Sequence, residues 1–154
     1  MKWLSISNNH RQGIYELWNN EERLLTLSWH PAEGTLRIAT EDEKRVFLIR
    51  KEGFLRSRTV LRNEYGIKIG QLINENNQEN LGTIELDHEK LNYSIQKDIL
   101  QVLTIYRQTE PLAICELPSV SKKNFHALYH DLLILALCWY IFMPATKKQV
   151  LAYA

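Results

Sequence analysis

Arg56, Arg58 and Arg62 lie at even spacing in the segment 55–62, which has the composition of a β-strand. Side chains alternate between the two faces of a strand, so the three guanidinium groups are expected on one exposed face. Lys68 follows across a turn at 63–66 and would extend this stripe. Arginine binds phosphate oxygens through paired hydrogen bonds, and each basic group near an anionic membrane contributes about 1 kcal/mol. The pattern predicts an anion or phospholipid-binding site at Arg56, Arg58, Arg62 and Lys68.

The same stripe also fits an ordinary hydrated surface. Outward-facing charged side chains are common on strands, and three nearby acidic residues would offset the positive charge: Glu64, Glu75 and Glu85. Arg50 and Lys51, on the preceding segment, would add to it. Ligand binding and simple hydration are therefore both consistent with these residues.

Other reactive residue types do not form a recognisable site. His126 and His130 share a helical face next to Asp131, but zinc needs a third and usually a fourth ligand, and neither an HExxH nor a CxxC pattern occurs. There is no GxSxG nucleophile motif and no glycine-rich phosphate loop. The acidic runs at 41–43 and 87–89 are typical of hairpin turns, not of calcium loops. We expect no enzyme activity, no metal and no cofactor.

Composition narrows the class of protein. The chain has 154 residues, and 19 Lys and Arg balance 18 Asp and Glu to a net charge of +1, so the overall charge does not favour nucleic acid. Aromatic residues are spread along the chain and do not cluster beside basic ones, as a nucleic-acid platform requires. Cys115 and Cys138 both lie in apolar stretches, which suits buried thiols in a reducing compartment. We therefore expect a cytoplasmic protein that does not bind nucleic acid.

The residues that could bind an anion must be positioned by strands. Eleven short segments have strand character and are separated by turn residues at a spacing near ten residues, as in an antiparallel meander. They are 2–7, 14–18, 23–29, 35–40, 45–50, 55–62, 67–73, 82–86, 91–96, 100–106 and 112–117. Several alternate between apolar and polar residues, which indicates one buried and one hydrated face.

An apolar run, 132–143 (LLILALCWYIFM), follows the strands. A helix that is apolar on all sides belongs in a protein core or a bilayer. We expect a helix over about 122–143, with capping residues at 119–124 and Pro144 as its end. Twelve residues of helix span about 18 Å, less than the roughly 30 Å of a bilayer core, so a core helix is favoured over a tail anchor.

Strands and helix together predict the fold. A sheet that closes on itself removes its edges but creates a lumen, and a helix that is apolar on all sides can fill that lumen. We expect one domain over 1–154, mainly β, built as a closed antiparallel β-barrel of about 11 to 12 strands around a hydrophobic C-terminal α-helix. Trp139, Tyr140 and Phe142 would wedge the helix against the barrel wall.

This order of elements, with the hairpin at 60–72 (VLRNEYGIKIGQL), resembles the tubby C-terminal-like superfamily over roughly 46–143. That group includes tubby domains, phospholipid scramblases and the plant LURP-one-related proteins. The resemblance implies a closed barrel around a central helix. It also implies binding of phosphoinositide headgroups on a basic patch of the barrel surface.

Together these features predict a non-enzymatic binding module that contacts an anionic phospholipid or a membrane surface, with a peripheral location on the cytoplasmic side. Two alternatives are a protein-interaction scaffold without lipid affinity and a carrier of a small apolar ligand. The carrier would need the helix outside the barrel and an open lumen.

Overall fold

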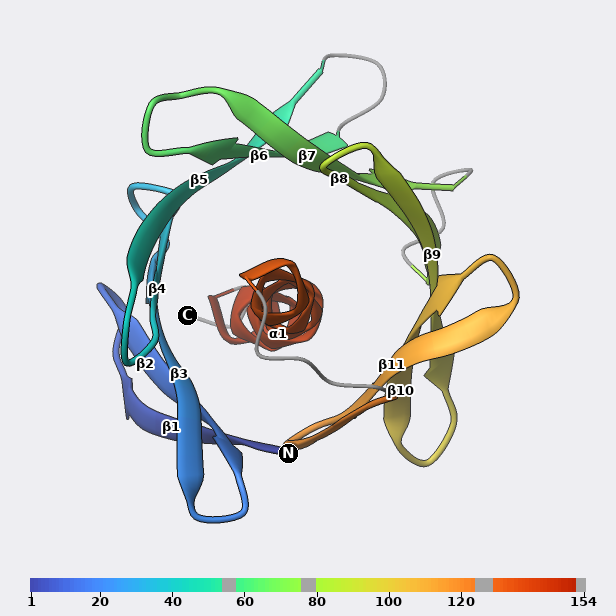
Figure 1. Cartoon of the computed structure of the whole chain (residues 1–154), viewed down its shortest axis with the longest axis horizontal. Coiled ribbons are helices and arrows are strands. Elements are labelled where there is room, and N and C mark those ends of the chain that lie inside the picture. Colours follow the sequence, from blue (N-terminus) through green and yellow to red (C-terminus); the bar gives the residue numbers. More distant parts are fainter. Residues whose placement is uncertain (54–57, 76–79, 124–128, 152–154) are drawn as a thin grey trace.

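The computed structural model describes residues 1–53, 58–75, 80–123 and 129–151. Twelve antiparallel strands form a closed barrel in which each strand pairs with its neighbours in sequence and β1 meets β12. Figure 1 shows the ring of strands with the helix α1 inside it. The strands are β1 (Lys2–Asn8), β2 (Gly13–Asn19), β3 (Glu22–His30), β4 (Thr35–Ala39), β5 (Lys44–Glu52), β6 (Arg58–Asn63), β7 (Lys68–Asn74), β8 (Leu81–Leu86), β9 (Glu89–Lys97), β10 (Gln101–Arg107), β11 (Glu110–Glu116) and β12 (Ser119–Lys122).

Each of the eleven predicted strands has a counterpart, although residues 55–57 of the predicted strand 55–62 lie outside the described residues. The turns between the strands follow from local chemistry. Asp87 and His88 join β8 to β9 with φ values of 46° and 71°. Two consecutive positive φ values are typical of a type I′ turn, whose twist matches that of the flanking strands. Gly34, which precedes β4, has a φ of 61°, and a Cβ atom there would lie 2.6 Å from the carbonyl oxygen of Ile49. This position therefore requires glycine.

The twelfth strand closes the barrel. Lys2 of β1 stands opposite Ser119 of β12, Trp3 N donates to Pro118 O at 2.8 Å, and Val120 N donates to Met1 O at 2.9 Å. The expectation that 119–124 caps a helix is therefore wrong for Ser119–Lys122. Those residues pair with β11 and β1, because the barrel can satisfy their backbone groups only if a strand fills this gap.

The helix α1 (Tyr129–Leu151) fills the lumen. Every residue from Leu132 to Trp139 is buried, in one cluster with the inward-facing residues of the strands. The predicted start near 122 is wrong, since β12 occupies that segment. Pro144 does not end the helix either: it removes one backbone hydrogen bond, but the helix continues to Leu151.

Aromatic residues join the helix to the wall. The ring of Trp139 lies 4.8 Å from that of Tyr15 and 6.5 Å from that of Trp3, measured between centroids. Tyr140 meets Trp29 edge to face at 5.6 Å. These contacts confirm the predicted wedge. They also show that the arrangement required for an apolar carrier, a helix outside an open lumen, is wrong.

Charged residues hold the first turn of α1 at the mouth of the barrel. Glu89 of β9 accepts a hydrogen bond from Arg107 Nε at 2.5 Å and lies 3.3 Å from His130 Nε2. The hydrogen bond to Glu89 raises the pKa of Arg107 above its usual range. Lys122, whose side chain is only 1% exposed, forms an ion pair with Asp131. Charged side chains thus surround the first turn of α1, before the apolar part of the helix begins.

Candidate anion-binding face

The outward faces of β4, β5 and β6 form a basic wall. In each strand the residues that alternate with the core positions point away from the helix. Among the described residues of these strands, the outward charged side chains are five basic ones and a single acidic one: Arg37, Lys44, Arg50, Arg58 and Arg62, with Glu52. We call this surface the basic wall. Its charge contrasts with a chain that is nearly neutral overall.

Strand register places the basic residues close together. Arg50 stands opposite Val60, and Arg58 precedes Val60 by two residues on the same face, so Arg50 and Arg58 are diagonal neighbours. Such neighbours have Cα atoms about 7 to 8 Å apart, within reach of long side chains. Arg37 and Lys44 form a second diagonal pair on β4 and β5. All four of these side chains are exposed.

Arg62 lies near the end of β6 and has partners of its own. Its Nη2 atom lies 3.1 Å from Glu52 Oε1 and 3.4 Å from Glu52 Oε2, and its Nη1 atom donates to Gly66 O at 3.1 Å. Arg62 is only half-buried, so this pair contributes modestly to stability. Val60, between Arg58 and Arg62 on β6, is 1% exposed although it alternates with the core residue Leu61. The Arg62–Glu52 pair neutralises one charge of the wall.

A groove of about 530 Å³ adjoins the wall along β7 and β8. Lys68 stands opposite Arg62 in register, and its Nζ atom donates to Gln71 Oε1 at 2.7 Å. The amide of Gln71 in turn donates to the carboxylate of Glu85. The groove therefore has mixed charge, unlike the mainly basic outward faces of β4–β6.

The predicted site residues are partly brought together. Arg58 and Arg62 lie on one face, as alternation predicts; Lys68 stands opposite Arg62 because the register between β6 and β7 shifts there, and Arg56 lies outside the described residues. Arg50 joins them, but Lys51 has the opposite alternation and does not face the wall. Sequence reasoning missed Arg37 and Lys44. Both residues alternate with core residues of β4 and β5, which could have indicated that they face outward. The sequence alone did not show which residues of other strands lie beside them.

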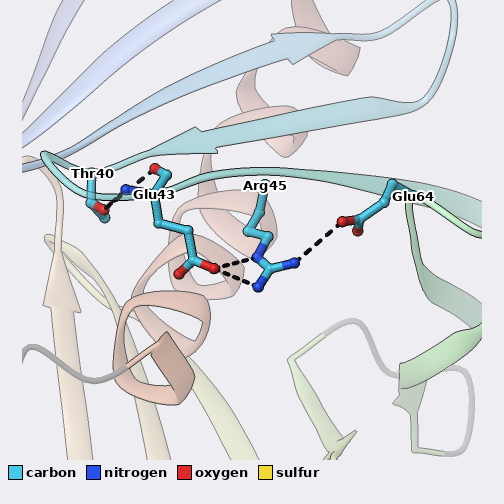
Figure 2. Close-up of polar contacts among 4 residues, drawn as sticks. All are labelled: Thr40, Glu43, Arg45 and Glu64. Atoms are coloured by element: carbon cyan, nitrogen blue, oxygen red, sulfur yellow. Dashed lines mark hydrogen bonds and ion pairs between the residues drawn. The ribbon is translucent and has the colours of Figure 1, made fainter.

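The acidic residues differ from expectation. Glu52, which sequence analysis did not single out, pairs with Arg62. Glu64 pairs instead with Arg45, which also contacts Glu43, as Figure 2 shows. Hydrogen bonding to Glu43 is the main reason why the pKa of Arg45 is raised above its usual range. Glu64 is therefore turned toward Arg45, at the rim of the barrel.

The described parts of the chain offer little for other chemistry. No group of three His, Cys, Asp or Glu side chains in them could hold a metal ion. His130 is engaged with Glu89, and His126 lies outside the described residues. Cys115 and Cys138 are buried free thiols, as predicted. Across the ranges that the structure describes, no helix is both long enough and apolar enough to cross a membrane.

In comparisons with known proteins, no family model, curated protein or solved structure matches the chain.

Proposed function

We propose that this barrel is a non-enzymatic module that binds anionic phospholipid headgroups at a membrane surface through the basic wall. The single observation that carries the proposal is the charge on the outward faces of β4–β6, where one acidic side chain accompanies five basic ones among the described residues. Because the chain as a whole is nearly neutral, a mainly basic surface on one side gives the protein an uneven electrostatic potential that is positive on that side. That potential orients the protein toward an anionic surface.

The chemistry of the wall suits phosphate. Arginine presents a planar fork of N–H donors that matches phosphate oxygens, and Arg50 and Arg58 are exposed diagonal neighbours able to contact one phosphate group together. Arg37 of β4 and Lys44, at the other end of β5, repeat this arrangement. The wall therefore offers two contact points along the side of the barrel, a geometry that favours an extended surface over a single small ligand.

The Arg62–Glu52 pair lies beside the first of these points, because Glu52 stands opposite Arg58 in register. Because its charges compensate each other, removal of Arg62 would leave Glu52 facing an anionic ligand. Arg37, Arg50 and Arg58 form no such bridge in the described structure, so their replacement tests binding with the least disturbance of the fold. The resemblance to tubby domains, which carry headgroups on a basic surface, is consistent with the same ligand class.

Vesicle sedimentation tests the proposal. The protein should pellet with phosphatidylcholine vesicles that contain phosphatidylserine or a phosphoinositide, and less so as salt rises, because ions screen exposed charges. Replacement of Arg37, Arg50 and Arg58 by Gln should lower the affinity on the order of a hundredfold, from about 1 kcal/mol per basic group.

A charge-matched control separates the wall from net charge. Arg11, Arg23 and Lys97 are also exposed but lie on other parts of the barrel, so their joint replacement by Gln removes the same charge. This control variant should still bind. Equal losses in the two variants, or no pelleting with any anionic vesicle, would refute the proposed function, and a protein-interaction role would then be the better reading.

A further inference from the structure

The turn between β6 and β7 presents two large apolar side chains to solvent. Tyr65 is 80% exposed and Ile67 is 61% exposed. Exposed apolar residues are ordinary on protein surfaces, and Ile99 and Leu100 form a second exposed pair at the β9–β10 turn; the β6–β7 pair differs in lying next to the basic wall. Arg62, near the end of β6, lies just before this turn, and Lys68 lies just after it.

Hydrogen bonds fix the turn in shape. Asn63 Oδ1 accepts from Tyr65 N at 3.0 Å and from Ile67 N at 2.9 Å. Gly66 N donates to Asn63 O at 3.0 Å, and Asn63 N donates to Ile67 O at 2.9 Å. Backbone groups must have internal partners wherever a segment leaves water, and these groups already have them. The turn can therefore enter a less polar environment without first rearranging.

Within the turn, the charged groups that flank the apolar side chains are basic. Arg62 Nη1 donates to Gly66 O at 3.1 Å, which holds a guanidinium group against the turn itself. Glu64, the acidic residue of the turn, lies 3.3 Å from Arg45 and is turned toward it (Figure 2). Lys68 is exposed at the start of β7. Arg62 and Lys68 thus flank the apolar side chains within the turn, while the neighbouring hairpins at this end carry the acidic runs 41–43 and 87–89.

We infer that the β6–β7 turn is a membrane-insertion tip, in which Tyr65 and Ile67 enter the interfacial region of an anionic bilayer while the basic wall contacts headgroups. The inference rests on the proposed function and adds which end of the barrel faces the membrane. Tyrosine favours the headgroup level, and isoleucine suits the boundary with the acyl chains, a depth of about 5 to 10 Å for interfacial elements. The barrel would then bind with this end tilted toward the membrane.

Fluorescence of a tryptophan at the tip tests the insertion directly. Tyr65→Trp should show a blue-shifted emission with phosphatidylserine-containing vesicles and quenching by brominated lipids. Trp3, Trp29 and Trp139 are buried, and Trp18 is half-buried, so the unsubstituted protein supplies the background. The control is Ile99→Trp. Ile99 is fully exposed in the β9–β10 turn, which lies at the opposite end because successive hairpins alternate between the ends of the barrel.

The expected result is a shift and quenching at position 65 and neither at position 99. A tip that stays as solvated as position 99 on vesicle-bound protein would overturn the inference, while binding that still depends on Arg37, Arg50 and Arg58 would leave the proposed function intact. Absence of vesicle binding under all conditions would refute both.

A second variant separates insertion from charge. Tyr65→Ser together with Ile67→Ser should weaken vesicle binding on the order of tenfold through lost apolar burial. The salt dependence should keep its slope, because all basic residues remain. Replacement of the wall arginines should instead flatten that slope. Unchanged affinity in the serine variant, with an unchanged melting temperature, would contradict insertion.

Discussion

Trp139 of α1 packs against Tyr15 of β2, with ring centroids 4.8 Å apart and ring planes inclined at 52°. Both residues are about 1% exposed, so the contact lies in the interior and joins the helix to the barrel wall. Trp3 lies within 6.5 Å of the same indole ring and belongs to β1, the strand that closes the barrel. The Trp139 side chain therefore packs against β2 and against β1, the strand that pairs with β12 to close the barrel.

Trp139→Ala should destabilise the protein by about 3 to 5 kcal/mol, the range for removal of a large buried aromatic side chain. Guanidinium unfolding followed by circular dichroism measures the loss. Trp139→Phe should cost less, since it keeps a ring and removes an indole N–H that has no acceptor among the described residues. Trp18→Ala, at a half-buried position, is the control. An unfolding midpoint of Trp139→Ala equal to that of Trp18→Ala would show that the helix does not stabilise the barrel.

Lys122→Met should also destabilise the fold strongly, because it leaves Asp131 without the ammonium group of a side chain that is 1% exposed. Removal of one partner of a buried pair costs about 3 to 5 kcal/mol. The double variant with Asp131→Asn should lose less than the sum of the two single variants in a double-mutant cycle. Arg23→Gln, which breaks the exposed pair with Glu16, should cost at most about 1 kcal/mol. Additive losses at Lys122 and Asp131 would argue against coupling.

Stability should fall at alkaline pH. Burial raises the pKa of Tyr15, and burial also raises the pKa of Tyr140, where a hydrogen bond with Thr59 partly offsets the effect. A phenol whose pKa is higher in the folded state stabilises the fold below the unfolded pKa of about 10, and this contribution is lost as pH rises through the folded value. Melting temperature measured from pH 8 to 12 should therefore drop above about 10. The Tyr15→Phe and Tyr140→Phe double variant should show a smaller drop, and identical pH profiles would contradict this assignment.

Most of the strands could be predicted from sequence because their signals are local. Alternation in segments such as Leu91, Tyr93 and Ile95, and turn residues such as Asp87 and Gly34, act over a few neighbouring positions. The same alternation correctly placed Arg58 and Arg62 on one face. The apolar run beginning at Leu132 likewise indicated a helix that needs burial on every side.

Features that depend on distant segments were not predictable in this way. Ser119–Lys122 becomes a strand because β1 and β11 leave a gap that only a twelfth strand can fill, although locally the segment resembles a helix start. The partner of Arg62 does not follow from strand register either: the register sets Glu52 opposite Arg58, yet the ion pair forms with Arg62, four residues further along β6.

The amino-acid sequence by itself determined the strands, the faces of their side chains and the need to bury the last helix, since each follows from residues within one or two turns of chain. Closure of the barrel, the start of the helix and the grouping of Arg37, Arg50 and Arg58 into one wall were decided only by the tertiary structure. The physical reason is that pairing between strands and packing inside the barrel optimise contacts between residues far apart in the chain. Those contacts override local preference wherever the two conflict.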